Sequence, residues 1–416
     1  MTRAFSHRFK ATSMAPVLIA GLPLSAIAEG FIDDASVTLG MRNLYFNRDF
    51  RQPAAAQSKQ EEWAQGFLLQ AKSGYTPGLF GVGIDLIGQL GFKLDSSPER
   101  SGSGLLPRHS DGRAVDDYSR LGLAPKLRLS KTELKVGELQ PELPILLRND
   151  GRLLPQTFQG GMLTSREFDG LTLQGGQMRS LSQRNSSDHE DLSVDGRGGV
   201  FADRFDYVGG EYRFNADRTQ VGLWQARLQD IYQQRFYNVS HKQKVGDWTL
   251  GANVGFFATQ EEGSADLGDL DNRALTSFVS ARYAGHTFGA GYQRMYGDDG
   301  MVYIAGTSTP LVNDIQVRNF TTAGERSWQV RYDYDFVALG IPGLSLMARY
   351  ASGDHAEVAG GSDGKAWERD LDITYVIQAG PLKNLGVRWR NAMVRSNHAA
   401  DVDENRLILT YTLKLF

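Results

Sequence analysis

The sequence predicts an all-β protein, a transmembrane antiparallel β-barrel of 18 strands, from three observations. From residue 31 onward, segments of about ten residues alternate between apolar and polar side chains, separated by Gly, Asp, Asn and Pro turns. The connectors between the segments alternate between short turns and long polar loops. An N-terminal segment of export type precedes them. Because helical periodicity is almost absent, a barrel fits the chain better than a helical fold.

The first 28 residues have the order of a secretory signal peptide. Three basic residues lie within the first ten positions, a short apolar run covers residues 17–24, and Ala26-Ile27-Ala28 precedes Glu29. A single anchoring helix is the alternative, but the apolar run is too short and prolines interrupt it. We therefore expect residues 1–28 to be removed and residues 29–416 to form the barrel domain.

The strands are expected where the alternation of polarity is strongest. The clearest segments are residues 82–88 (VGIDLIG), 343–350 (GLSLMARY), 371–378 (LDITYVIQ), 385–393 (LGVRWRNAM) and 406–416 (RLILTYTLKLF). All predicted strands begin near residues 36, 61, 78, 115, 132, 161, 170, 204, 219, 232, 247, 273, 286, 325, 343, 367, 384 and 403. An even number of strands fits a barrel whose two ends lie on one side. A soluble β-sandwich is the alternative.

Short turns are expected on one side of the barrel and long loops on the other. The short turns are residues 73–78, 130–131, 284–286, 339–343 and 379–384. The long polar loops include residues 95–117 and 184–199, which we expect to be solvated. Since hydrocarbon offers the backbone no hydrogen-bond partner, a sheet that crosses a membrane has to close on itself. Aromatic residues suited to the membrane interfaces are Trp63, Tyr75, Tyr283, Trp328, Tyr350, Trp367 and Tyr375.

The composition excludes several classes of protein and site. Lys and Arg total 45 and Asp and Glu total 48, and the resulting net charge of −3 argues against a nucleic-acid-binding protein. The chain has no cysteine, which excludes disulfides, thiolate nucleophiles and cysteine-based metal sites. A metal site of carboxylates or histidines stays open on composition alone, although we expect no metal and no cofactor.

Arginines recur on the polar face of the predicted strands. In residues 385–395 (LGVRWRNAMVR), Arg388 and Arg390 lie opposite Trp389, because successive side chains of a strand point to opposite faces. In a barrel of this size the polar face lines a lumen wide enough for water. The same assignment places Arg42, Arg48, Lys126, Arg128, Lys135, Arg331, Arg349 and Arg406 in the lumen. The acidic residues assigned there are Asp85, Glu133, Asp333, Asp370 and Asp372.

A cluster of inward arginines predicts a path for anions. For any single arginine, a structural ion pair across the strands is the simpler interpretation. For arginines on consecutive strands, the repulsion between like charges favours a functional use. Arginine binds a carboxylate through two parallel hydrogen bonds and stays charged at any relevant pH. Each contact also has to be weak enough for the ion to leave.

Residues 140–160 (QPELPILLRNDGRLLPQTFQG) form a connector unlike the polar loops. A loop exposed to water has no reason to be this apolar. We expect the connector to fold into the barrel, pack against the wall and narrow the lumen, with Arg148 or Arg152 at the constriction. Its other predicted constriction residues are Pro144, Leu153 and Phe158. An external lid is the alternative.

Two further functional classes fit parts of the sequence. An outer-membrane enzyme would need catalytic residues, but His189, His286 and His355 lie in separate predicted loops and turns, without a G-x-S-x-G motif. We therefore expect no catalytic residues. An adhesive or structural barrel, with a sealed lumen and loops that bind a partner, is the other alternative.

Six stretches resemble the OprD family of substrate-specific outer-membrane porins. They are residues 42–49 (RNLYFNRD), 116–146 (DDYSRLGLAPKLRLSKTELKVGELQPELPIL), 151–160 (GRLLPQTFQG), 228–238 (LQDIYQQRFYN), 285–300 (GHTFGAGYQRMYGDDG) and 324–336 (GERSWQVRYDYDF). The resemblance runs from about Gly30 to Phe416. It implies an 18-stranded barrel in a Gram-negative outer membrane, with an inward-folded third loop and a ladder of basic residues that guides small carboxylates passively. The implied partners are outer-membrane lipid and carboxylate solutes, with no nucleic acid, and the barrel is expected to be monomeric or weakly trimeric.

The resemblance also assigns the ladder. The family's basic positions resemble Arg48, Arg152, Arg388, Arg390 and Arg406, while Arg42, Arg128, Arg331 and Arg349 fit by their strand face. The connector at residues 140–160 resembles the branch of the family that takes cyclic and aromatic monocarboxylates, so we expect a benzoate- or phenylacetate-type solute. A channel for basic amino acids is the alternative, and it would need an acidic pocket opposite the ladder.

Overall fold

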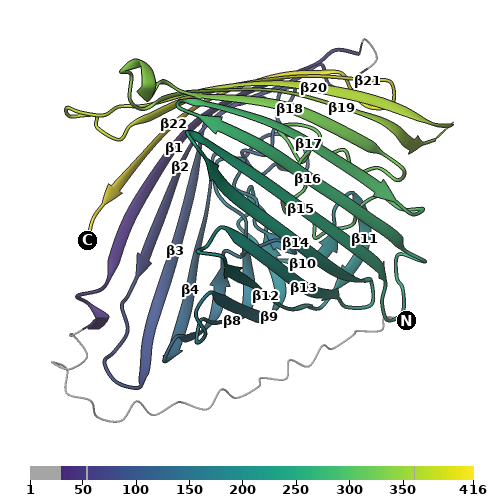
Figure 1. Ribbon diagram of the computed structural model, residues 1–416. Helices are drawn as coiled ribbons and strands as arrows, with labels where there is room; N and C mark the ends of the chain where they lie inside the picture. The colour runs from purple at the N-terminus through teal and green to yellow at the C-terminus, as the bar shows by residue number, and fades with distance from the viewer. Residues whose placement is uncertain (1–29, 53–54, 360) are drawn as a thin grey trace, which may run out of the picture.

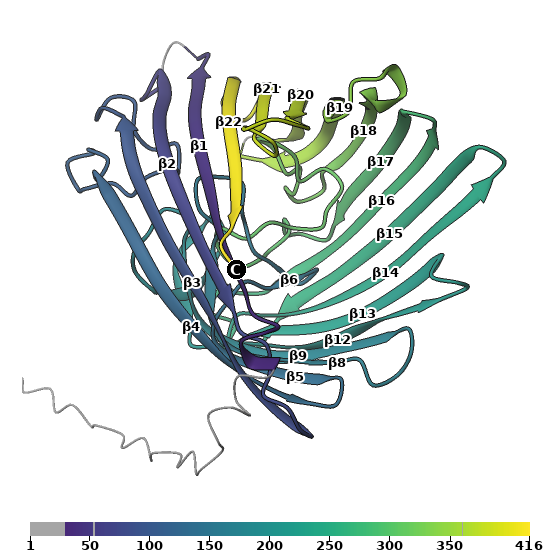
Figure 2. The ribbon, with the colours of Figure 1, turned by 90° about the vertical axis from the view of Figure 1, so that its left-hand side faces the viewer.

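The chain folds into one closed antiparallel barrel (Figures 1 and 2). The structure, a computed structural model, describes residues 30–52, 55–359 and 361–416. In these residues 18 strands form the barrel. They are β1 (Ser36–Phe50), β2 (Lys59–Lys72), β3 (Phe80–Asp95), β4 (Asp117–Leu129), β5 (Thr132–Leu139), β8 (Thr157–Ser165), β9 (Leu171–Ser182), β12 (Phe205–Phe214), β13 (Thr219–Leu228), β14 (Tyr232–Val245), β15 (Trp248–Glu261), β16 (Asp271–Tyr283), β17 (His286–Tyr296), β18 (Arg326–Asp335), β19 (Leu344–Val358), β20 (Gly361–Val376), β21 (Gly386–Ser396) and β22 (Val402–Lys414).

The barrel closes where its first and last strands pair. β1 and β22 run antiparallel from Thr38 opposite Lys414 to Phe50 opposite Val402. Each other barrel strand pairs with the next barrel strand along the chain. An open edge in hydrocarbon would leave backbone N–H and C=O groups without partners, so closure removes that cost. In the described part of the chain, no helix is both long enough and apolar enough to span a membrane.

The 18 strands predicted from alternation are confirmed in number and order. The largest difference is at β20, which is predicted to begin near residue 367 and begins at Gly361. The first residues of β20 are small or polar and carry no apolar alternation, so their pattern does not mark a strand. The predicted signal peptide, residues 1–28, lies outside the described residues.

The outward face of the barrel is apolar and carries aromatic residues at its rims. Leu121 and Val208 are 70% and 61% exposed, as expected for side chains that contact lipid. Trp328, Tyr350 and Trp367 lie side by side on neighbouring strands, with ring centroids 5.7 and 5.8 Å apart. This row belongs to the interfacial belt that the sequence predicts.

The prediction that Tyr75 belongs to this belt is wrong. Tyr75 lies in the turn between β2 and β3, where it is half-buried and donates a hydrogen bond to Glu133. Lys126 and Arg128 lie over its ring, at 4.9 and 4.4 Å from the centroid. A tyrosine near a strand end can turn inward where cations offer a contact with its ring, and sequence alternation does not distinguish the two cases.

Four long loops lie at one end of the barrel, and their chain runs inside the ring of strands (Figure 2). They are residues 96–116, 140–156, 183–204 and 297–325. Within them are the short strands β6 (Glu142–Leu143), β7 (Leu146–Leu147), β10 (Glu190–Val194) and β11 (Arg197–Ala202). Shorter connections lie at the opposite end, including the 3-10 helix η1 (Phe336–Leu339) between β18 and β19.

Residues 95–117 and 184–199, which the sequence predicts to be solvated, are exposed at positions such as Asp111 and Asp188 but are buried at their leucines. Leu105, Leu106 and Leu192 are fully buried. Leu105 and Leu106 share an apolar cluster with Leu153 and Leu154 of the third loop and with side chains of β1. A few leucines within a polar run thus suffice to hold a loop inside the barrel, because each finds its apolar partners on other segments.

Candidate functional site

The third loop, residues 140–156, folds into the barrel and packs against its wall as the sequence predicts. Leu153 and Leu154 are each 1% exposed and belong to the cluster that contains Phe46 of β1. Gly66 of β2 allows this close approach, because a Cβ atom added there would lie 2.9 Å from Cγ of Leu153. The loop is therefore fitted to the strands behind it.

The other residues predicted for the constriction lie in different places. Phe158 is fully buried, but it belongs to β8 and not to the loop. Pro144 is half-buried in the turn between β6 and β7. Arg148 forms an ion pair with Glu142 at 2.6 Å within the loop. Arg152, in contrast, lines a cavity of the lumen.

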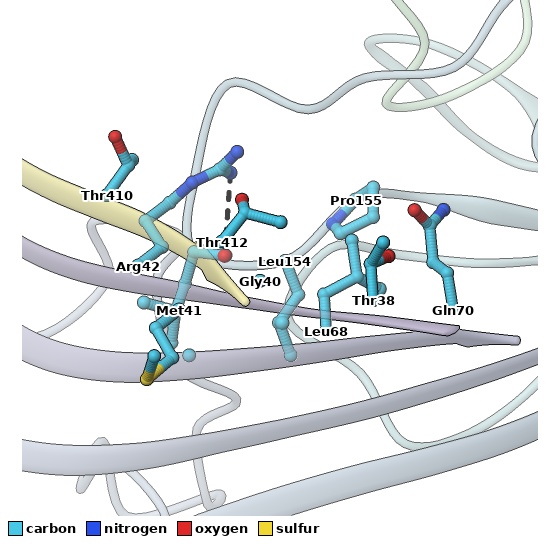
Figure 3. A pocket seen from close by; sticks show the side chains of 12 residues that line it. Thr38, Gly40, Met41, Arg42, Leu68, Gln70, Leu154, Pro155, Thr410 and Thr412 are labelled. Atoms are coloured by element: carbon cyan, nitrogen blue, oxygen red, sulfur yellow. Dashed lines mark hydrogen bonds between the residues drawn. The ribbon is translucent and has the colours of Figure 1, made fainter. Parts of the chain in front are cut away.

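Arg42 of β1 holds the end of the third loop. Its guanidinium group donates hydrogen bonds to the Asp150 carboxylate at 2.8 Å and to the backbone carbonyls of Arg152 and Leu153 at 2.6 and 3.5 Å. Beside it is a cavity of about 240 Å³. The cavity is lined by Thr38, Leu68, Gln70, Leu154, Pro155, Thr410 and Thr412, among others (Figure 3).

Replacing Arg42 with methionine is expected to loosen the third loop. The variant loses hydrogen bonds from a charged donor, each worth at least about 1.5 kcal/mol when shielded from water. We expect larger and noisier single-channel currents in a planar bilayer. Thr410→Val is the matched control, because Thr410 lines the same cavity but has no hydrogen bond from its side chain to the described part of the loop. Equal currents from both variants would contradict the anchoring role.

Three arginines surround the ring of Phe46. The guanidinium carbons of Arg48, Arg152 and Arg406 lie 5.3, 5.1 and 5.3 Å from the ring centroid. They come from β1, the third loop and β22, which the closure of the barrel brings together. The face of an aromatic ring attracts cations, so Phe46 helps to keep three like charges close to one another.

Glu404 supplies the negative charge of this cluster. Its side chain is 0% exposed and accepts hydrogen bonds from Nε of Arg48 at 2.8 Å, from Nε of Arg406 at 2.7 Å and from Nε2 of Gln316 at 3.0 Å. Arg406 itself is 2% exposed and also donates to the backbone carbonyl of Gln316. A buried charge is tolerated only with such partners.

Four arginines line one cavity of about 390 Å³ inside the barrel. They are Arg152 of the third loop, Arg184 of the loop after β9, Arg390 of β21 and Arg406 of β22. The cavity is also lined by Asp195, Tyr303, Asp314 and Asn319. The site therefore combines several permanent cations with a smaller number of carboxylates.

Arg184 is a cavity residue that sequence reasoning missed. It lies in a loop expected to be solvated, and neither alternation nor a motif marks it. Burial, with the nearby Arg406 as a second cause, lowers the pKa of Arg184 to about 10, so it stays charged at neutral pH. Asp314, in the loop at residues 297–325, is likewise marked by neither alternation nor a motif. Burial raises the pKa of Asp314, although its carboxylate accepts hydrogen bonds from the backbone N–H and hydroxyl of Thr309 at 2.8 and 3.0 Å.

A second cavity, of about 380 Å³, lies nearer the short-turn end. Arg282, Arg331 and Arg388 line it. Asp372 bridges the two cavities, because it accepts hydrogen bonds from Nε of Arg388 at 2.9 Å and pairs with Arg390 at 3.1 Å. The remaining predicted inward pairs are Arg331 with Asp333 at 2.7 Å and Arg349 with Asp370 at 2.9 Å.

The structure does not bring every predicted residue to these cavities. Arg128 lies over the Tyr75 ring on the wall formed by β4 and β5. Asp85 there pairs with Lys126 at 2.6 Å and Lys135 at 2.8 Å. None of these side chains lines either arginine cavity. Among the residues with described positions, no group of three His, Cys, Asp or Glu side chains could hold a metal ion.

The chain matches a known protein family over nearly its whole length. The family model "outer membrane porin, OprD family" matches residues 29–415. The porin-like protein GalP of Pseudomonas putida is 48% identical over 401 residues, which cover 96% of each chain. The crystal structure of OccK9 (OpdG) of Pseudomonas aeruginosa is 80% identical, with a TM-score of 0.93, and the match covers 93% of this chain and 100% of that one.

For two similar proteins of Pseudomonas aeruginosa, a crystal structure with an organic acid has been solved. OpdK with vanillate is 49% identical, with a TM-score of 0.89, and the match covers 92% of this chain and 100% of OpdK. OccK2 (OpdF) in complex with glucuronate is 46% identical, with a TM-score of 0.86 and coverage of 93% and 100%.

These matches fix the class of the protein. A closed barrel of this family is a substrate-specific channel of the Gram-negative outer membrane, and not an enzyme. Its outward face contacts lipid and its lumen passes small solutes. The chain belongs to the OprD family of outer-membrane porins.

Proposed function

We propose that the channel conducts small carboxylates, with aromatic or cyclic monocarboxylates as the preferred class. The single observation that carries this proposal is the 390 Å³ cavity lined by Arg152, Arg184, Arg390 and Arg406. A carboxylate that enters it meets guanidinium groups able to bind it through paired hydrogen bonds. The vanillate and glucuronate held by two relatives are both carboxylates, which supports the same chemistry here.

The proposed path is a series of cationic stations. Arg48 and Arg406 share Glu404, Arg390 and Arg388 share Asp372, and the second cavity continues towards the short-turn end. Partial neutralisation by these shared carboxylates weakens each station, so that an anion can leave it again. Neither a moving part nor an energy source is required. Arg42 would contribute by holding the third loop, and Arg128 has no station in either cavity.

The proposal includes the processing and assembly of the chain. Residues 1–28 would be removed during export, and the barrel would act as a monomer or a weak trimer. The lumen of each barrel carries its own arginine set, so conduction would not depend on association.

A channel for basic amino acids is the second candidate. It is favoured by Asp195 and Asp314, which line the same cavity as the arginines and could hold an ammonium group. The arginines outnumber these carboxylates in the cavity, which favours a simple anion over a cationic amino acid.

Single-channel recording in a planar bilayer tests the proposed function. Benzoate, glucuronate and arginine would be added in turn on one side of the membrane. We expect benzoate to permeate or to interrupt the current at the lowest concentration. If glucuronate is more effective, the carboxylate path stands but the aromatic preference does not. If arginine is the most effective solute, the channel belongs to the second candidate function.

Lowering the pH is expected to raise the permeation of anions, because Asp314 in the cavity becomes protonated. Because burial raises the pKa of Asp314, this carboxyl group binds a proton at a pH above the ordinary value of about 3.9 for aspartate. As the pH falls through the raised pKa, the cavity loses a negative charge and the folded channel also gains stability. The measurement is the reversal potential in a salt gradient between pH 7 and pH 4.

Asp314→Asn should show the raised anion selectivity at every pH, so its reversal potential should not change as the pH falls from 7 to 4. Asp111→Asn is the control, because Asp111 is an exposed loop residue whose pKa is lowered by hydrogen bonds from Arg113. A pH step that survives in Asp314→Asn would assign it to another group.

A further inference from the structure

The lipid-facing wall of the barrel contains a groove across β17 to β20. It encloses about 620 Å³, a volume typical of sites for small ligands. Its floor is Ala348, which lies between Tyr332 and Leu371 in one cross-strand row. Phe288, 51% exposed, stands beside Tyr332 on the neighbouring strand. A small residue among large apolar ones leaves a hollow in a surface that is otherwise covered by side chains.

One cation lines this groove from the lipid side. Arg369 is an exposed residue of β20 that stands opposite Tyr350, one outward position nearer the long-loop end than Leu371. Its guanidinium group donates a hydrogen bond to the neutral Asn391 side chain at 2.6 Å. Among the described residues, no carboxylate lies within 4.0 Å of it. An arginine on the lipid face costs up to about 2–4 kcal/mol at the bilayer midplane and little at the interface.

The position of Arg369 is that of the membrane interface. Tyr350, its cross-strand neighbour, belongs to the aromatic row with Trp328 and Trp367. Such rows lie at the level of lipid headgroups, where phosphate groups are available. An arginine binds phosphate through a planar fork of N–H donors, and the apolar groove below it offers contact along a hydrocarbon chain.

We propose that this groove binds a membrane lipid, with one acyl chain over Ala348 and a phosphorylated headgroup held by Arg369. The occupant has to be both anionic and apolar, because the site pairs one uncompensated guanidinium with an aromatic and aliphatic hollow. A second barrel seated there would instead have to supply a carboxylate to Arg369. The inference concerns the outer wall and is independent of the solute that passes through the lumen.

Native mass spectrometry of the full-length barrel tests the proposal. Phosphatidylglycerol and diacylglycerol with identical acyl chains would be titrated against the protein in a nonionic detergent. We expect Arg369→Gln to weaken the retention of phosphatidylglycerol about tenfold, towards the level of diacylglycerol. Ala348→Phe fills the hollow and should lower the retention of both lipids. Bilayer conductance of each variant reports that the barrel has folded.

Arg235→Gln is the matched control. Arg235 of β14 is likewise an exposed arginine bonded to a neutral side chain, Gln225 at 3.0 Å, but it does not line the groove. We expect it to retain phosphatidylglycerol like the wild type. The proposal fails if Arg235→Gln loses as much lipid as Arg369→Gln, or if folded Ala348→Phe binds as the wild type does. It also fails if the wild type is recovered as lipid-free dimers or trimers.

Discussion

Replacing both Arg388 and Arg390 with alanine is expected to lower the uptake of benzoate by about tenfold or more. Both arginines pair with Asp372, which is buried in the barrel wall. Without them, this part of the proposed anion path carries the unpaired negative charge of Asp372. The unpaired Asp372 carboxylate should lower the stability of the variant, but the strand pairing of β21 with β20 and β22 is unchanged, so the barrel should still close. Benzoate permeability of liposomes that contain the purified barrel is the measurement.

Two further variants make this expectation specific. Arg395→Ala removes an arginine from the same strand, but Arg395 lies on the opposite face and pairs with Asp403 at 2.8 Å, so uptake should not change. Adding Asp372→Asn to the double variant should recover part of the uptake, because the unpaired charge is gone. Unchanged uptake by a folded Arg388→Ala, Arg390→Ala barrel would remove both residues from the path.

Replacing Glu404 with glutamine should have the largest effect on stability. The variant keeps the shape of the side chain but leaves the charges of Arg48 and Arg406 without their shared carboxylate. Breaking a buried pair in this way costs about 3–5 kcal/mol. The same change makes the lumen more positive, so each benzoate molecule should block the current for longer. The measurements are the temperature at which the barrel unfolds and the residence time of benzoate.

Asp403→Asn is the control for Glu404→Gln. Asp403 is the preceding residue of β22, but it lies on the other face and pairs with Arg51 and Arg395. We expect a small loss of stability and no change in benzoate residence. If Glu404→Gln is as stable as the wild type, Glu404 is not needed to stabilise the buried charges of Arg48 and Arg406, and the prediction is wrong.

The strands could be predicted from the sequence because the membrane imposes a simple rule on them. Every second residue meets lipid, so period-two alternation marks the strands and assigns each side chain to a face. The same rule also marks Glu404, which is two residues from Arg406 on the same face, although it was not among the acidic residues predicted for the lumen.

The loop residues of the site could not be predicted in this way. Arg184 and Asp314 reach the cavity from the loops at residues 183–204 and 297–325, whose conformations have no period. Period-two alternation does not mark the loop at residues 297–325. Its place depends on long-range contacts, such as Val302 and Ile304 in an apolar cluster with Leu192 and Phe158. Contacts between distant segments leave no local pattern in the sequence.

The closure of the barrel between β1 and β22 links assembly to conduction. Arg48 stands directly opposite Glu404 across this seam, and Phe46 stands opposite Arg406. A slip of two residues in the pairing would keep the apolar face towards lipid, but it would move Arg48 away from Glu404. Arg48 would then lose its carboxylate, and Arg406 would lose the Phe46 ring that stands opposite it. A barrel that closes in the wrong register would therefore be less stable and would also lack the arginine cluster that we propose binds anions.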